Sequence, residues 1–176
     1  MNYKVDQIIT NEDRHNLIDL YNSLDSNIAH QDYNLYNIDK RRLNTKDYTQ
    51  DKKYHDIIKK IEAYAKRKTH SHYFVMYHEG SYTRMHTDDD EAVGQTIVTL
   101  VDTVDLIGGD TLALLSAELT EDKKGYQKGD DHKGRVVPRV IRMDVGDSVS
   151  YDRSLLHGVS QLERGKRLVL VSWFLT

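Results

Sequence analysis

Apolar residues recur at helical spacing in the first third of the chain. From Leu17 to Leu24 they lie three or four positions apart, behind a Thr10–Asp13 segment whose residue types suit a helix N-cap. A second apolar stripe, with lysines on the opposite face, predicts another helix within about 49–68. Both patterns are typical of scaffold helices packed on a sheet, and helices that bind a partner are the alternative.

The pattern changes at about residue 72. Short runs of β-branched and aromatic residues, separated by Gly and Asp, predict strands. Because no helical pattern stands between them, they favour an antiparallel sandwich or jelly roll over a parallel sheet. The runs are HYFVMY (72–77), QTIVTLVDTV (95–104), TLALL (111–115), RVVPRVI (135–141), DSVSYD (147–152) and RLVLVSWFL (167–175).

The predicted fold class is α+β and mainly β. A chain of 176 residues can bury one sizeable core, whereas two domains would each be small, so we expect one domain over 1–176. It would comprise helical support over about 1–70 and a jelly-roll core over about 71–176. The charged, Gly-punctuated segment 116–135 fits a long loop or exposed hairpin, serving either as a lid or as a plain surface excursion.

Composition narrows the chemistry and the partners. The formal charge of -3, with acids and bases mixed along the chain, predicts no broad attraction for nucleic acid. There is no cysteine, so any metal must be held by nitrogen and oxygen ligands. The N-terminus lacks a secretory pattern and no stretch has the length and apolarity of a membrane span, so the expected location is the cytoplasm.

The candidate metal ligands are His86, Asp88 and a distant His157. Two histidines and one carboxylate on one face of an octahedral metal leave three positions open, which is the arrangement of non-haem Fe(II) oxygenases. The H-x-D spacing suits this geometry when both residues lie on one side of a strand. The spacing alone is near the frequency expected by chance.

A second H-x-D, His30-Gln31-Asp32, serves as an internal control. It lies in a polar stretch with no strand before it, and we interpret it as surface. His86 differs because an aromatic strand leads into it, Gly80 breaks the chain before it, and further strands with glycines follow.

Arg167 is the candidate carboxylate-binding residue. By strand alternation it shares a face with Val169, Val171 and Trp173, so it would project into an otherwise apolar pocket. Arginine is suited to binding a carboxylate through two parallel hydrogen bonds. Arg164 and Lys166 compete for this role. Arg164 lies in the preceding turn and Lys166 falls on the opposite face, so both rank below Arg167.

These residues stand within a larger, ordered pattern over about 72–175. The segment from Tyr77 through Gly80 to Asp88 resembles the Y-x-x-G…H-x-D signature of prolyl 4-hydroxylase-like Fe(II)/2-oxoglutarate-dependent dioxygenases. Gly108-Gly109-Asp110-Thr111 is similar to their GGET turn. Three later segments resemble the family's G-x-x-x-x-F, LH-x-V and G-x-R…WF elements. They are Gly146 to Tyr151, then Leu156-His157-Gly158-Val159, and then Gly165-Lys166-Arg167 leading to Trp173-Phe174. Asp110 and Tyr151 depart from the family's Glu and Phe.

The resemblance implies a double-stranded β-helix, or jelly roll, backed by N-terminal helices, and it implies a role for each site residue. His86, Asp88 and His157 would bind Fe(II), with no further catalytic side chain implied. Arg167 and Thr111 would bind the C5 carboxylate of 2-oxoglutarate. The remaining two roles go to Tyr77, which would hydrogen-bond the cosubstrate near the metal, and to Trp173, which would line the pocket.

The implied reaction is hydroxylation of a C–H bond, with 2-oxoglutarate and O2 as cosubstrates and ascorbate as a candidate reductant. The expected substrate is a prolyl residue in a peptide or protein, a hypothesis that rests on the resemblance alone.

The alternatives are an oxygenase acting on a small molecule or a nucleobase, and a non-catalytic jelly-roll binding module. A nucleic-acid oxygenase would be expected to have a basic surface, which the mixed charge does not predict. The binding module is disfavoured because His86, Asp88, His157 and Arg167 are all present. The acidic residues Asp89, Asp90 and Glu91 would either border the entrance or form a solvated turn.

Overall fold

The computed structural model describes residues 3–25, 35–88, 90–114 and 138–176. Within these residues the chain forms three helices and nine strands. The helices are α1 (Asn11–Ser23), α2 (Thr45–Thr49) and α3 (Lys52–Ala65). The strands are β1 (Tyr3–Asp6), β2 (Leu35–Leu43), β3 (Thr69–His86), β4 (Val93–Gly108), β5 (Thr111–Leu114), β6 (Arg139–Ile141), β7 (Ser148–Asp152), β8 (Leu156–Val159) and β9 (Leu162–Leu175).

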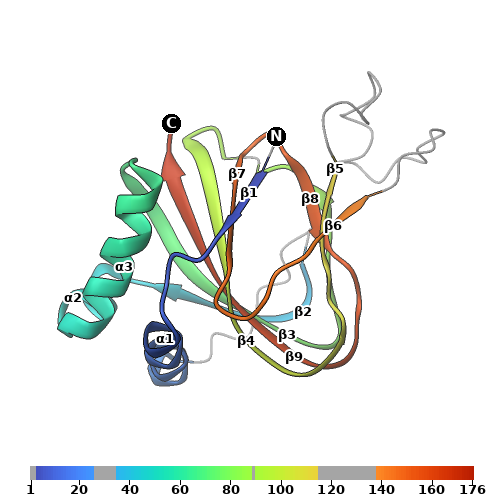
Figure 1. Cartoon of the computed structure of the whole chain (residues 1–176), viewed down its shortest axis with the longest axis horizontal. Coiled ribbons are helices and arrows are strands. Elements are labelled where there is room, and N and C mark those ends of the chain that lie inside the picture. The colour runs from blue at the N-terminus through green and yellow to red at the C-terminus, as the bar shows by residue number, and fades with distance from the viewer. Residues whose placement is uncertain (1–2, 26–34, 89, 115–137) are drawn as a thin grey trace.

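All the strand pairings are antiparallel, in the order β1-β7-β4-β9-β3-β8-β5-β6, with β2 added on β3. The sheet curls round on itself, and α1 and α3 lie on its outer side (Figure 1). A strongly twisted sheet of this many strands curls readily, because each strand is rotated against its neighbour. The predicted fold class, a mainly β jelly roll with N-terminal helices, is confirmed.

The N-terminal cap of α1 forms as its residue types predict. The Thr10 hydroxyl accepts a hydrogen bond from the Asp13 N–H at 3.1 Å, and the Asp13 carboxylate accepts from the Thr10 N–H at 2.8 Å. This reciprocal pair satisfies two backbone donors that the first helical turn would otherwise leave free. The predicted second helix is realised as α3, whose apolar stripe is buried through Ile57, Ile58, Ile61 and Ala65.

Strand β9 separates two of the hydrophobic cores among the described residues. Three of its residues pack under the helices: Leu168, Leu170 and Phe174. The alternate residues line a cavity inside the curled sheet: Arg167, Val169, Val171 and Trp173. This division is the period-2 alternation expected of a strand with a buried environment on both faces. The predicted common face of these four residues is therefore confirmed.

The prediction of helices alone in the first seventy residues is wrong, because β1 and β2 lie there. β1 is short and lies at one end of the strand order, and it forms by pairing with β7 far along the chain. β2 has a polar sequence and pairs with β3. Neither has the apolar run that marks a strand locally. The short β8, with the sequence LHGV, was missed for a similar reason.

Arg41 explains why a polar segment such as β2 is held against the rest of the fold. Its Nη1 donates to the carbonyl oxygens of Tyr21 and Leu24, both at 2.9 Å, at the C-terminal end of α1. Its Nη2 donates to Asp39 at 2.8 Å, and its guanidinium lies 4.1 Å from the centre of the Tyr21 ring. The cation thus satisfies carbonyls that the helix end leaves without partners.

Gly80 bends β3 instead of ending it, contrary to the sequence expectation. It has a φ of 84°, a left-handed conformation that glycine adopts without a steric penalty. The register between β2 and β3 shifts at this point. Because of the bend, the first part of β3 pairs with β9 and its last part pairs with β8. A single strand thereby joins two regions of the curled sheet.

Two sequence interpretations lie outside the described residues. They are the loop assignment of 116–135 and the surface assignment of His30-Gln31-Asp32. Among the helices that are described, none combines the length and the apolar character needed to cross a membrane.

His72 is a buried histidine on β3. The residue is only 1% exposed, and its Nδ1 lies 2.8 Å from the Ser172 hydroxyl. Its Nε2 has no hydrogen-bond partner among the described residues. Burial lowers the pKa of His72 to about 4, against the opposing effect of the nearby Glu62 charge. The folded protein therefore holds this ring neutral at pH values where an unfolded chain would protonate it.

We expect the free energy of unfolding to decrease as the pH falls from about 6.5 to about 4. In this window the unfolded chain binds a proton at His72 that the folded chain excludes, which contributes on the order of 3 kcal/mol. His72→Asn should flatten the pH dependence, although it lowers stability overall by removing the ring. Urea unfolding at stepped pH measures this effect, with His15→Asn on the exposed face of α1 as the control. An unchanged slope in His72→Asn would exclude His72 as the source.

Candidate metal centre

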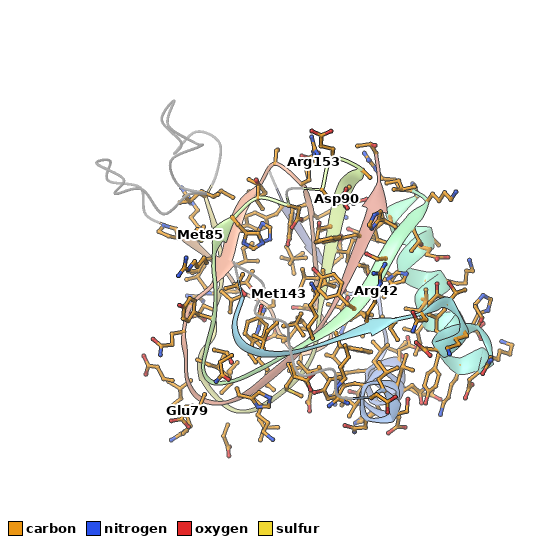
Figure 2. The ribbon with its side chains drawn as sticks, turned by 180° about the vertical axis from the view of Figure 1, so that it is seen from behind. Arg42, Glu79, Met85, Asp90, Met143 and Arg153 are labelled. Atoms are coloured by element: carbon orange, nitrogen blue, oxygen red, sulfur yellow. The ribbon has the colours of Figure 1, made fainter. Side chains whose placement is uncertain are left out.

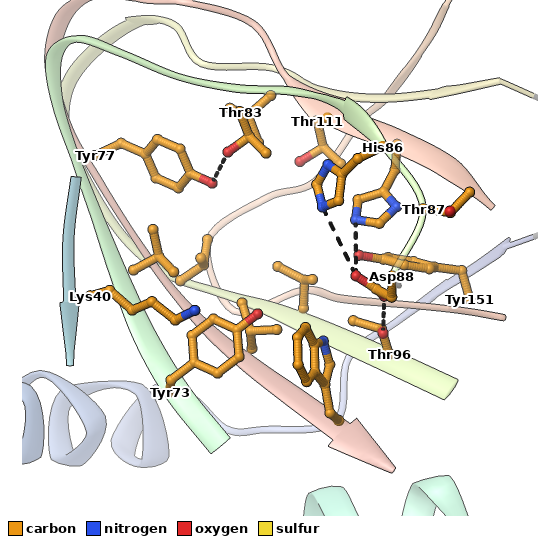
Figure 3. Close-up of a pocket in the computed structure, with 18 of the residues that line it drawn as sticks. Lys40, Tyr73, Tyr77, Thr83, His86, Thr87, Asp88, Thr96, Thr111 and Tyr151 are labelled. Atoms are coloured by element: carbon orange, nitrogen blue, oxygen red, sulfur yellow. Dashed lines mark hydrogen bonds and ion pairs between the residues drawn. The ribbon is translucent and has the colours of Figure 1, made fainter. Parts of the chain in front are cut away.

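His86 and His157 face each other across two antiparallel strands. His86 is the last residue of β3, its partner on β8 is His157, and their ring centroids are 4.4 Å apart. Asp88 follows the end of β3, and its Oδ1 lies 4.0 Å from Nε2 of His86 and 3.8 Å from Nε2 of His157. The three predicted ligands thus form one cluster, with ligand atoms within 4.8 Å of one another (Figure 3).

A β-bulge aims His86 at this cluster. Thr83 is opposite Val159 and His86 is opposite His157, so three steps along β3 match two steps along β8. Without the extra residue, Thr83 and His86 would point to opposite faces of the sheet. With it, both side chains line the same cavity.

Both imidazoles are held in the form that a metal ligand requires. Nδ1 of His86 lies 2.7 Å from the Arg84 carbonyl oxygen, and Nδ1 of His157 lies 2.9 Å from that of Leu155. A carbonyl only accepts, so we infer that each Nδ1 carries the proton and each Nε2 presents its lone pair to the cluster. Burial, followed by the charge of His86, lowers the pKa of His157 to about 4, which keeps this ring neutral at neutral pH.

Asp88 is oriented by two hydrogen bonds. The Thr96 hydroxyl donates to its Oδ2, and its own backbone N–H donates to the Arg153 carbonyl oxygen at 3.2 Å. Oδ1 remains directed at the two imidazoles. Only 7% of Asp88 is exposed, so its charge lies in a largely dry site where an opposite charge would be strongly attracted.

Arg167 forms the cationic end of the same cavity. It is 3% exposed, and its Nη2 donates to the Thr111 hydroxyl at 2.7 Å. Its Nη1 is buried with no hydrogen-bond partner among the described residues. Tyr77 is its partner across the β3–β9 pair, and the Tyr77 hydroxyl bonds to that of Thr83 at 2.7 Å. The sequence expects Tyr77 to act near the metal, whereas the structure places it beside Arg167.

The cavity that contains these groups has a volume of about 240 Å³. Along with the His86–Asp88–His157 cluster and Arg167, its wall includes Thr111, Tyr77 and Trp173. The Trp173 ring meets the Tyr73 ring edge to face at 5.4 Å between centroids. The two basic residues that ranked below Arg167 do not line it. Arg164 and Lys166 are exposed, and Arg164 donates to the Asp105 carbonyl oxygen.

No family model and no curated protein sequence matches the chain. Its fold, however, is similar to that of solved structures. One is a prolyl-4-hydroxylase from Pseudomonas putida, at 14% identity and a TM-score of 0.65, covering 99% of this chain and 92% of that one. Another is a viral collagen prolyl hydroxylase from Paramecium Bursaria Chlorella virus-1 in complex with 2-oxoglutarate, at 14% identity and a TM-score of 0.66, covering 98% and 95%.

A third similar structure is HygX from Streptomyces hygroscopicus, with nickel, 2-oxoglutarate and hygromycin B bound. It is 10% identical, with a TM-score of 0.65, and the match covers 99% of this chain and 82% of HygX. The chain has the fold of the 2-oxoglutarate/Fe(II) oxygenases. At these identities the likeness concerns the fold, and the site must be argued from this chain's own residues.

Sequence reasoning missed several residues around the oxygenase-fold cavity. Thr96 could have been found by alternation, because it shares a strand face with Val98, which also lines the cavity. Thr83 has no such signal, since its position relative to His86 depends on the bulge. Lys40 lies on the unpredicted β2, where its Nζ is 4.3 Å from the centre of the Tyr73 ring. These two required the tertiary structure.

The acidic run after Asp88 divides between the two expected roles. Asp90 lines the cavity, and its carboxylate lies 3.3 Å from Nε2 of His70. Its carbonyl accepts a hydrogen bond from Arg153 at 3.3 Å, and Figure 2 shows these two residues near each other at one end of the sheet. Glu91 is exposed, as a solvated turn predicts, and Asp89 lies outside the described residues.

We expect Thr96→Val to weaken metal binding by about ten- to a hundredfold, because a hydrogen-bonded carboxylate ligand loses the group that orients it. Calorimetric titration of the metal-free protein with Mn(II) measures the change in affinity. Thr99→Val is the matched control, since Thr99 is a buried threonine on the same strand that bonds Ser148 at 2.7 Å and not Asp88. An equal loss of Mn(II) affinity in the two variants would mean that the substitutions act by disturbing β4, and not through the hydrogen bond to Asp88.

Proposed function

We propose that the protein is an Fe(II)- and 2-oxoglutarate-dependent dioxygenase. The observation that carries the proposal is the Nη1 of Arg167, a buried guanidinium nitrogen without a hydrogen-bond partner among the described residues, in the same cavity as the His86–Asp88–His157 cluster. A buried cation without an anion is costly, so this end of the cavity is suited to a carboxylate ligand.

The donor set at the other end fits Fe(II). Two imidazoles and one carboxylate, all from the protein, form the ligand set that leaves further coordination positions open in non-haem iron oxygenases. Among the described residues, Asp88 supplies the one carboxylate of the cluster. His86, Asp88 and His157 would therefore hold the metal, with Thr96 and the two backbone carbonyls holding the ligands in position.

The other cavity residues fit 2-oxoglutarate. Its C5 carboxylate would bind Arg167 and Thr111, which are already joined by a hydrogen bond of 2.7 Å. Tyr77 and Thr83 present a second pair of hydroxyls beside this cradle. The apolar walls Val169 and Val171, together with Trp173, would exclude water from the bound cosubstrate.

When bound, iron and 2-oxoglutarate supply the oxidation itself: 2-oxoglutarate and O2 yield succinate and CO2 while a substrate C–H bond is hydroxylated. The protein's part is to fix the two ends of the cosubstrate and to keep the site dry. Ascorbate, as a reductant that keeps the metal in the Fe(II) state, belongs to the same proposal.

We further propose a prolyl residue of a peptide or protein as the substrate. The sequence resemblance supports this, and two of the similar solved structures are prolyl hydroxylases. A small-molecule substrate is the second candidate, because a similarly folded protein, HygX, has been solved with hygromycin B bound. Mass spectrometry separates the two: a gain of one oxygen on proline in offered peptides supports the first, and oxygenation of small molecules only supports the second.

We expect the protein, reconstituted with Fe(II) without air and then given 2-oxoglutarate and O2, to form succinate. His86→Ala should reduce succinate to the level of the sample without protein, because a metal ligand is lost. His15→Ala, on the exposed face of α1, should retain the wild-type rate. Succinate formation by His86→Ala at the wild-type rate would contradict the ligand assignment, and no succinate from the wild type would favour a binding module.

Arg167→Met should weaken 2-oxoglutarate binding by about ten- to a hundredfold, since it removes a charged hydrogen-bond donor from a buried site. The affinity for Mn(II) alone should stay unchanged. Calorimetric titration of the metal-free protein with Mn(II), and of the Mn(II)-loaded protein with 2-oxoglutarate, gives the two affinities. Arg164→Met is the matched control, because Arg164 lies on the same strand but is exposed outside the cavity. Equal affinities for 2-oxoglutarate in the two variants would contradict the assignment of Arg167 to the cosubstrate site.

A further inference from the structure

Tyr151 is a buried aromatic residue that adjoins the metal cluster. It lies on β7, opposite Thr96 of β4, and is 5% exposed. Its ring packs against the His157 imidazole, with 4.6 Å between centroids and an interplanar angle of 47°. Figure 3 shows its hydroxyl end turned toward Asp88 and the imidazoles. The family pattern that the sequence resembles has phenylalanine here, whereas this chain has a tyrosine with its hydroxyl.

The Tyr151 hydroxyl differs from the other hydroxyls of the cavity. Those of Tyr77, Thr96 and Thr111 all have protein partners. Tyr151 also lines the cavity, and no hydrogen bond joins its hydroxyl to another described residue. A hydroxyl that is open to the cavity in this way is available to a ligand or a water there.

The Tyr151 hydroxyl can act as a hydrogen-bond donor. A tyrosine has an ordinary pKa of about 10, so it carries its O–H hydrogen at neutral pH and can donate it to an anionic oxygen. The neighbouring Asp88 carboxylate already accepts from Thr96 and is directed at the imidazoles, and it does not bond to Tyr151.

We propose that Tyr151 is a ligand-positioning residue whose hydroxyl donates a hydrogen bond to the keto-acid end of 2-oxoglutarate. The inference rests on the proposed function, in which Arg167 binds the C5 carboxylate and the keto-acid end lies at the cluster. Tyr151 adjoins His157 and Thr96 at that second end, so it would act on the keto-acid oxygens. A packing role alone would need only the ring.

The test compares Tyr151→Phe with the wild type, because this change removes the hydroxyl and keeps the ring against His157. Calorimetry on the Mn(II)-loaded protein would follow the binding of two probes, 2-oxoglutarate and oxalate. Oxalate has oxygen atoms on two adjacent carbons, as the keto-acid end of 2-oxoglutarate does, but it has no counterpart of the C5 carboxylate. The quenching of Trp173, the single tryptophan of the chain, would report that each probe enters the cavity.

We expect Tyr151→Phe to bind both probes about tenfold more weakly, as the loss of a hydrogen bond to a charged group predicts. The affinity for Mn(II) without probe, and the melting temperature, should remain close to those of the wild type. Arg167→Met serves as the contrasting variant, because it should weaken 2-oxoglutarate and leave oxalate unchanged.

Unchanged affinities in Tyr151→Phe would overturn the inference and leave a packing role. A loss confined to 2-oxoglutarate would also overturn it, since the hydroxyl would then act at the C5 end. A visible charge-transfer band in the Fe(III)-loaded wild type that disappears in Tyr151→Phe would make Tyr151 a metal ligand instead. If the wild type binds neither probe, the proposed function itself fails, and that failure is distinct from the other outcomes.

Discussion

The antiparallel pairing of β3 with β8 is the constraint on which the site depends. It sets His86 directly opposite His157, where side chains of cross-strand partners come within contact distance. Gly158 makes the approach close enough: a Cβ there would lie 2.8 Å from the Thr83 carbonyl oxygen and 2.9 Å from the Met85 sulfur. A larger residue would force the two strands apart and separate the imidazoles.

Two local irregularities make that pairing compatible with the rest of the sheet. The bend at Gly80 lets one strand pair with β9 first and with β8 afterwards. The bulge between Thr83 and His86 then turns the histidine inward. A regular strand over the same residues would keep Thr83 in the cavity and point His86 away from it. The arrangement of His86, Asp88 and His157 is thus a product of departures from ideal strand geometry.

The polar groups of the cavity divide into those that are satisfied and those directed at a ligand. Backbone carbonyls fix both imidazoles, Thr96 fixes Asp88, and Thr111 holds one side of Arg167. Among the described residues, the Arg167 Nη1 is left without a hydrogen bond, and the Tyr151 hydroxyl lines the cavity beside His157. One lies at the cationic end and the other beside the metal cluster. A cavity built in this way favours a ligand with an anionic group at each end.

The sequence by itself determined the features that depend on short-range periodicity. Alternation along β9 put Arg167 and Trp173 on one face, the residue types at Thr10 and Asp13 specified the start of α1, and the ordered glycine and histidine motifs indicated the three clustered ligands. Tertiary structure decided what depends on register between distant strands: the opposition of His86 and His157, the support of Asp88 by Thr96, and the place of Tyr151 beside the cluster. Strand period and helix capping act within a few residues, so they are legible in the chain, whereas register is set by packing between segments far apart in sequence.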